Sequence, residues 1–199
     1  MNFYSLILIF TLACIFFFVL RIVLAWRSTG RNPINFKNSD SVHDYLGKWI
    51  FVLIFLSFLQ VFFVAILLQF RNYFVVISFL DSSGVQYFGL VLGVLSLIFL
   101  FSAQMSMGKS WSIGIEKSRK THLVSRGFFN IMRHPIYFGY IILSWSIFLM
   151  LPTALSLLFA GLTTVILNVQ ARLEEEFLLQ RDGITYGNYM EEVKRWGVW

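Results

Sequence analysis

The chain of 199 residues has little of what a soluble protein needs. Charged residues make up 13% of it, against about 25% in an ordinary globular domain, whereas apolar residues make up 58%. A domain of this size has too little interior to bury so many apolar side chains, which excludes a soluble globular protein and a disordered chain. The single cysteine, Cys14, excludes an internal disulfide. The composition therefore indicates a protein whose solvent is lipid.

The common local signatures of nucleotide and metal chemistry are also missing. The sequence contains no GxGxxG, no P-loop, no HExxH and no CxxC pair, so we expect no bound metal. The net charge is +6, but most aromatic residues lie within the apolar runs and are not interleaved with basic residues, so we expect no nucleic-acid partner.

Four stretches of the chain lack Asp, Glu, Lys and Arg, and they cover residues 1–20, 49–70, 82–108 and 134–171. Each of the first three suits one membrane helix of about 20 residues, and we expect the first to be uncleaved. The fourth is too long for one crossing and has Pro152 near its middle, which predicts a tight hairpin of two helices over about 135–151 and 153–172. The predicted fold is an all-α integral membrane protein with five transmembrane helices and a cytoplasmic C-terminal helical segment.

The basic residues predict the orientation. All of the Lys and Arg residues except Arg71 fall in the loops 21–48 and 109–133 or in the tail after residue 171. Because positively charged loops stay in the cytoplasm, we expect the N-terminus outside and the C-terminus inside, with anionic lipid as a partner.

Two polar clusters interrupt the apolar pattern, at residues 133–139 (Arg-His-Pro-Ile-Tyr-Phe-Gly) and at residues 170–176 (Gln-Ala-Arg-Leu-Glu-Glu-Glu). The predicted hairpin brings them side by side at the cytoplasmic face. Arg133 and His134 at a helix N-terminus favour a bound anion, and glutamates at a helix C-terminus favour a cationic or hydroxyl-rich ligand. Together they predict a zwitterionic ligand with an amino-acid moiety. Two simpler interpretations remain: Arg133 meets lipid phosphate, and the last helix continues to about Gln180 with its acids in water.

An amphipathic stripe follows the glutamates, formed by Tyr186, Tyr189, Val193 and Trp196. It predicts either a helix on the membrane surface or a lid over a ligand pocket. Trp111, after the third run, is either an interfacial tryptophan or part of the site.

Five short motifs occur in order along the second half of the chain. They are Gly108-x-x-Trp111, Leu123-Val124-x-x-Gly127, Arg133-His134-Pro135-x-Tyr137-x-Gly139, Glu174-Glu175-x-x-Leu178 and Gly183-x-x-Tyr186-x-x-Tyr189. In this order the region from about Gly108 to Trp196 resembles the isoprenylcysteine carboxyl methyltransferase and phospholipid methyltransferase superfamily of membrane enzymes.

The resemblance implies that S-adenosylmethionine is the methyl donor and S-adenosylhomocysteine the product. It implies an N-terminal three-span region, 1–108, and a methyltransferase-like cofactor-binding region, 109–199. The cofactor-binding residues that we predict are Leu123, Val124, Phe129, Arg133, His134, Pro135, Tyr137, Glu174, Glu175 and Tyr186.

The predicted acceptor is lipophilic, and we expect Gln170 and Arg172 to orient it. The family's prenylcysteine enzymes have an arginine four residues before the first of the paired glutamates, where this chain has Gln170, with Arg172 two residues later. Prenylated protein, amino lipid, phenol and small thiol all remain open as acceptors. A sulfonium methyl is already activated, so the enzyme mainly has to align a nucleophile with it and exclude water.

Three alternatives to a methyltransferase remain open. They are a nicotinamide-dependent reductase of the sterol-reductase type, a non-enzymatic membrane scaffold and a small transporter. The oligomeric state is open as well.

Overall fold

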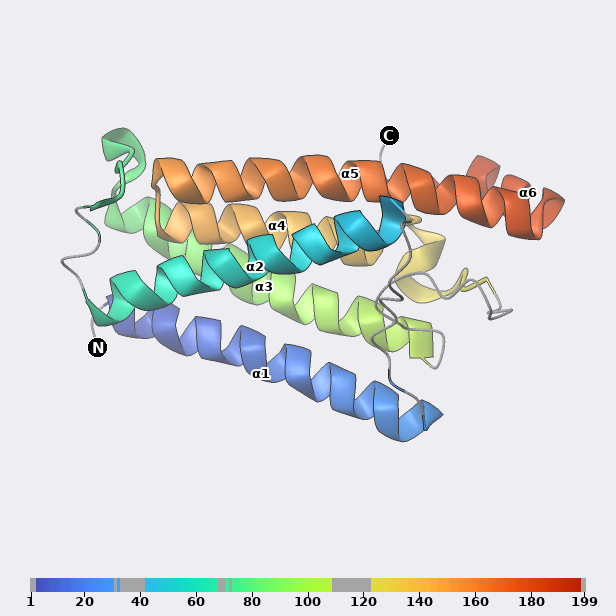
Figure 1. The fold of residues 1–199 in the computed structure, drawn as a ribbon, viewed down its shortest axis with the longest axis horizontal. Helices are drawn as coiled ribbons and strands as arrows, with labels where there is room; N and C mark the ends of the chain where they lie inside the picture. Colours follow the sequence, from blue (N-terminus) through green and yellow to red (C-terminus); the bar gives the residue numbers. More distant parts are fainter. Residues whose placement is uncertain are drawn as a thin grey trace.

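The protein is a bundle of long helices with a short helix at one end (Figure 1). The computed structural model describes residues 3–30, 32, 42–67, 71, 73–108 and 123–197. The α-helices are α1 (Phe3–Thr29), α2 (Val42–Ile66), α3 (Ser83–Met107), α4 (Pro135–Met150), α5 (Ala154–Asp182) and α6 (Ile184–Glu192). Two 3-10 turns, η2 (Ser78–Leu80) and η4 (Gly127–Asn130), complete the regular structure of these ranges.

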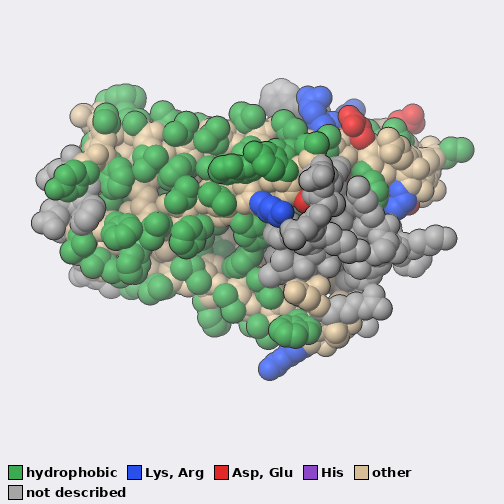
Figure 2. Space-filling view, in the orientation of Figure 1, with side chains coloured by type: hydrophobic (Ala, Val, Ile, Leu, Met, Phe, Trp, Pro, Cys, Tyr) green, Lys and Arg blue, Asp and Glu red, His purple; other side chains and the backbone are tan. Residues whose placement is uncertain are grey.

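The surface of the bundle is apolar. Helices α1, α2, α3 and α5 are each long and apolar enough to cross a membrane, while α4 has 16 residues and is shorter. Hydrophobic side chains cover the visible face of the bundle, and charged side chains gather toward the end where α6 lies (Figure 2). Large apolar side chains such as Phe16, Phe55 and Val165 are about 60% exposed, which is favourable only where the surroundings are lipid. The prediction of an all-helical membrane protein is therefore confirmed.

The predicted hairpin is present. Helix α4 ends at Met150 and α5 begins at Ala154, so Pro152 lies in the turn between them. Thr153 caps α5: its hydroxyl accepts a hydrogen bond from the Ser156 amide at 3.1 Å, and the Ser156 hydroxyl accepts one from the Thr153 amide at 3.1 Å. The turn is held from outside, because the Gln60 side chain donates to the Thr153 hydroxyl at 2.7 Å.

One boundary was predicted wrongly. The last long helix does not end near residue 172 but continues to Asp182, so Glu174, Glu175 and Glu176 lie more than a turn before its C-terminus. The alternative of a helix to about Gln180 is thus confirmed, although Glu175 is buried and does not face water. The residues after 172 are mostly Leu, Glu, Gln and Arg, which favour helix, and the first residue that interrupts them is Gly183, with a φ of 53°. The helix dipole therefore does not explain the role of these glutamates.

Glycine allows α3 and α4 to pack closely. A Cβ on Gly89 would lie 2.8 Å from both the Leu149 Cβ and the Met150 backbone nitrogen. A Cβ on Gly139 would lie 2.6 Å from the Leu100 side chain. Near that contact the Ser96 hydroxyl donates to the Gly139 carbonyl at 2.8 Å. Small residues that let helix backbones approach are the usual basis of helix association in membranes. This packing fixes the position of α4, and with it the first polar cluster.

We expect Gly89→Ala to destabilise the protein by about 1–3 kcal/mol, because the added methyl meets backbone that cannot move aside. Gly161→Ala on α5 is the matched control, since a Cβ there would meet nothing within 4 Å. Thermal unfolding in detergent, followed by circular dichroism, measures both. Equal midpoints for the two variants would contradict this account of the α3–α4 contact.

Candidate functional site

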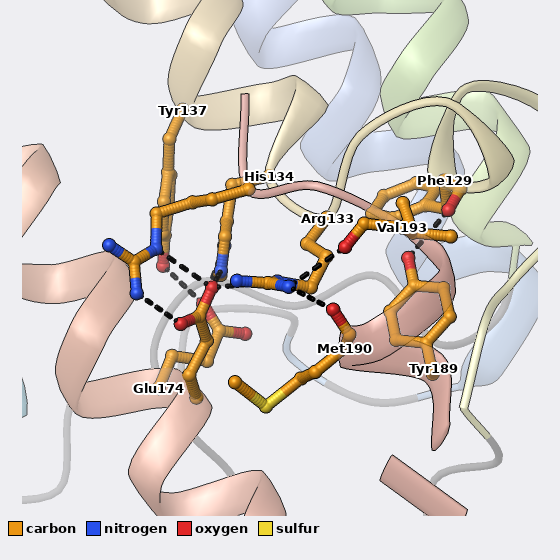
Figure 3. A network of polar contacts seen from close by, with 10 residues as sticks. Phe129, Arg133, His134, Tyr137, Glu174, Tyr189, Met190 and Val193 are labelled. Carbon is orange, nitrogen blue, oxygen red and sulfur yellow. Dashed lines mark hydrogen bonds and ion pairs between the residues drawn. The ribbon is translucent and has the colours of Figure 1, made fainter. Parts of the chain in front are cut away.

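The two polar clusters meet at one end of the bundle, as predicted. Glu175 on α5 contacts both Arg133 and His134, which directly precede α4 and are labelled in Figure 3. The Arg133 Nε donates to Glu175 Oε1 at 2.9 Å, and His134 Nε2 lies 3.1 Å from the same oxygen. A carboxylate only accepts hydrogen bonds, so Nε2 of His134 carries the proton in this contact.

A third cation completes the contacts of Glu175. The Arg195 Nε donates to Oε1 at 3.0 Å, and its Nη2 pairs with Oε2. This hydrogen bonding to Glu175 raises the pKa of Arg195 above its usual value. Side chains of Glu175 and Arg133 are 4% and 8% exposed, so this is a buried ion pair with the second arginine at its edge. We call Arg133, Glu175 and Arg195 the clasp.

The clasp joins the C-terminal tail to the start of α4. The Arg133 Nη1 donates to the carbonyls of Met190 and Val193 at 2.9 and 2.8 Å. The amides of Arg133 and His134 donate to the carbonyls of Lys194 and Arg195 at 3.0 and 3.4 Å. The anion expected at the N-terminus of this helix is thus supplied by Glu175.

Glu174 has a different environment from its neighbour. Its Oε2 accepts a hydrogen bond from the Tyr137 hydroxyl at 2.8 Å and lies 3.7 Å from His134 Nδ1. The side chain is 30% exposed, and within the described part of the chain Tyr137 is its only hydrogen-bond donor. Gln170, which is buried one turn before Glu174 on α5, lies beside the same tyrosine. The rings of His134 and Tyr137 are stacked, with centroids 5.3 Å apart and planes 4° apart, as their spacing on one helix face predicts.

Helix α6 buries its tyrosines against the chain. Tyr186, Tyr189 and Val193 form a small buried cluster, against which Leu123 packs. The Tyr189 hydroxyl donates to the Phe129 carbonyl at 2.5 Å, and burial raises the pKa of Tyr189 to about 12, so this donor stays protonated. Three of the four stripe residues thus face protein, and the fourth, Trp196, lies with its ring centroid 6.1 Å from that of His134. The stripe is not the lipid-facing side of a surface helix.

The predicted site residues fall into three groups. Arg133, His134, Tyr137, Gln170, Glu174 and Glu175 come together around the two glutamates. A second group lies at or near the packing surface of α6: it consists of Tyr186, Leu123 and Phe129. Pro135 is buried at the first turn of α4, and Val124, next to Leu123 in sequence, is half-buried. Arg172 is exposed, and it makes no ion pair with any other described residue, so the structure does not bring it to the glutamates. Trp111 lies outside the described residues.

The sequence reasoning did not find Arg195 or the carbonyls of Met190 and Val193. The sequence indicated only that Arg195 is one of the basic residues of the tail. No pattern near it predicts that its partner is Glu175, a carboxylate 20 residues earlier in the chain. The carbonyl contacts depend on where the chain turns after α6, which no side-chain pattern encodes.

Part of the chain is similar to known proteins. Residues 89–180 match the isoprenylcysteine carboxyl methyltransferase (ICMT) family. A methanethiol S-methyltransferase from Crocosphaera subtropica is 36% identical over 66 residues, which are 33% of this chain and 25% of that protein. A methanethiol S-methyltransferase 1 from Bradyrhizobium diazoefficiens is 38% identical over 71 residues, which are 36% of this chain and 24% of that protein.

The matched region thus spans about a quarter of the length of these curated relatives. The resemblance to the ICMT-like membrane methyltransferases that the motifs indicated is confirmed for residues 89–180. That region contains the start of α4, the hairpin turn and both glutamates.

We expect Glu175→Gln to release the C-terminal tail, because two arginines lose the carboxylate that neutralises them. Breaking a buried pair by removing one partner costs about 3–5 kcal/mol. Trypsin cleavage after Lys194 and Arg195 in native protein should become much faster. The matched control is Glu176→Gln at the neighbouring, exposed position. Cleavage at the control rate in Glu175→Gln would contradict the role of the clasp.

Proposed function

We propose that this protein transfers a methyl group from S-adenosylmethionine to a small lipophilic acceptor that reaches it from the bilayer. The observation that carries the proposal is the difference between the two glutamates. Glu175 is saturated by protein donors, while Glu174 is half-buried beside His134 and Tyr137 with capacity for further donors. The family match and the names of the relatives support methyl transfer.

The residues present suit the amino-acid end of the donor. His134 uses Nε2 to donate to Glu175, so in the neutral ring Nδ1 is an acceptor that faces Glu174 Oε2 at 3.7 Å. Two acceptors facing each other favour a cationic donor group beside them, and an α-ammonium group is such a donor. Glu174, His134 and Tyr137 would hold this end, and the bound donor would supply a methyl group that needs no further activation. The clasp fixes the tautomer and orientation of His134.

The acceptor side of the proposal rests on Gln170. It is buried beside Tyr137, whereas Arg172 is exposed, so we assign acceptor positioning to Gln170 and expect only a small effect from Arg172→Gln. The two relatives are named for methanethiol, which makes a small thiol the first acceptor to test.

The proposed membrane arrangement has five crossings, with α4 as the short fourth one. Arg71 pairs with Asp81 just before α3, and the start of α3 lies at the end of the bundle away from α6 (Figure 1). All other Lys and Arg residues fall in the loops 21–48 and 109–133 or in the tail, so the N-terminus faces outward and the site faces the cytoplasm. S-adenosylmethionine then reaches the site from water. The division into regions 1–108 and 109–199 remains part of the proposal.

Binding of radiolabelled S-adenosylmethionine to purified protein in detergent tests the donor site. We expect saturable binding that S-adenosylhomocysteine displaces and that NADPH does not. Glu174→Gln should weaken it by about tenfold or more, since a charge-assisted hydrogen bond contributes roughly 1.5–3 kcal/mol. Glu176→Gln should bind as the parent protein does.

Displacement by NADPH would instead favour the reductase alternative. If the folded protein binds neither S-adenosylmethionine nor NADPH, the scaffold alternative is favoured. Mass spectrometry of small molecules that co-purify with the protein gives an independent check, with S-adenosylhomocysteine as the expected ligand.

A further inference from the structure

A cavity of about 230 Å³ lies inside the bundle between α1, α2, α3 and α4. Its walls include Cys14 of α1, Phe55 and Phe58 of α2, Gln104 of α3 and Tyr140 of α4. Phe55 is 63% exposed, so this wall of the cavity is also part of the lipid-facing surface of the bundle. No residue in its wall is charged.

The cavity lies close to the site described above. Tyr140 follows Tyr137 by three residues on α4, a rise of about 4.5 Å along the helix. Gln104 is near the end of α3 that lies beside the start of α4, because the two helices run antiparallel (Figure 1). An occupant of the cavity would therefore lie one helical turn deeper in the membrane than the polar cluster.

Gln104 and Tyr140 form the polar part of the cavity wall, and hydrogen bonds hold them in place. The Gln104 side chain donates to the Tyr140 hydroxyl at 3.4 Å, which leaves the tyrosine proton to be donated into the cavity. Arg21 of α1, itself 3% exposed, donates to the Gln104 carbonyl at 3.0 Å and to the Gly108 carbonyl at 3.3 Å. This contact ties α3 to α1 at the cavity and limits how far its walls can separate.

Size and polarity restrict the occupant. An apolar cavity of about 150 Å³ holds benzene, so about 230 Å³ corresponds to roughly nine non-hydrogen atoms. An ionised group would be costly in these walls, since nothing there compensates its lost hydration. A polyprenyl chain or a two-chain lipid is too large.

We propose that this cavity binds the body of the methyl acceptor. The acceptor is an uncharged molecule of roughly nine non-hydrogen atoms with one small S–H or O–H head near Tyr140. The identity of the occupant as acceptor rests on the proposed function, whereas its binding does not. In the transfer the acceptor sulfur forms a bond to the methyl carbon, the carbon–sulfonium bond breaks, S-adenosylhomocysteine leaves and the thiol proton goes to water.

The test combines binding with methyl transfer. Binding of radiolabelled octan-1-ol, which has nine non-hydrogen atoms, is measured by equilibrium dialysis without the donor. Methyl transfer is measured as S-adenosylhomocysteine formed from alkane-1-thiols of increasing length, with a phosphine reductant present and concentrations corrected for detergent partitioning. We expect kcat/KM to peak near octane-1-thiol and to fall at least about tenfold at hexadecane-1-thiol, the effect of overfilling a packed site.

Two pairs of variants alter the cavity in opposite directions. Cys14→Leu fills it and should weaken octan-1-ol binding by about tenfold. Its control is Ala13→Leu, because Ala13 does not line this cavity but lines the neighbouring groove between α1 and α3, which shares Phe17, Leu97 and Phe101 with it. Phe55→Ala enlarges the cavity and should move the best thiol to a longer chain, whereas Phe62→Ala, a similarly lipid-exposed position on α2 that does not line the cavity, should not.

The outcomes separate the two proposals. Cavity-dependent octan-1-ol binding by protein that neither binds S-adenosylmethionine nor methylates any thiol would keep the binding site and overturn the proposed function. Two results would overturn the cavity proposal and keep the function. One is methylation that is as efficient with hexadecane-1-thiol as with octane-1-thiol, and the other is methylation that Cys14→Leu and Phe55→Ala leave unchanged. If Cys14→Leu and Ala13→Leu reduce octan-1-ol binding equally, the alcohol binds elsewhere, and this result would also overturn the cavity proposal.

Discussion

One buried carboxylate determines the arrangement of the site. Glu175 accepts hydrogen bonds from Arg133, His134 and Arg195, which belong to the start of α4 and to the tail after α6. A carboxylate in this position needs positive partners, because an unpaired buried charge is strongly unfavourable. The converse also holds, because two arginines so close together are stable only with a carboxylate between them to neutralise their charge. Three segments that are distant in sequence are therefore held together at one end of a bundle whose core is largely apolar.

This constraint gives the two adjacent glutamates different roles. Neighbouring residues on a helix point about 100° apart, so Glu175 faces the protein while Glu174 faces the edge of the cluster. Glu174 contacts Tyr137 and approaches His134, and His134 is itself held by Glu175. A ligand on Glu174 would thus meet groups whose positions the protein has already fixed, and such preorganisation is what an aligned transfer reaction requires. The apolar cavity one turn deeper then lies beside this fixed surface.

Much of the architecture could be predicted, because it depends on composition and on single residues with strong local effects. The uninterrupted apolar runs predicted membrane helices, and Pro152 predicted the hairpin that brings residues 133–139 and 170–176 together. The preferred end of α5 was wrong because a gain in charge was taken for the end of a helix, although Leu, Glu and Gln continue helices in water as well. The longer helix had been left open only as an alternative. The partner of Glu175 in the tail was missed because contacts between distant charged residues leave no local periodicity. The separate roles of Glu174 and Glu175 could not be predicted, because two adjacent glutamates look the same in the sequence. The site residues remain predictions that binding experiments have to test.

The most direct test of the central claim is an experimental structure of the protein with S-adenosylhomocysteine bound. The account predicts that the amino-acid end of the ligand lies against Glu174, His134 and Tyr137, while Glu175 keeps both Arg133 and Arg195. A ligand bound directly to Glu175 in place of either arginine, or one that occupies a different part of the molecule, would contradict it.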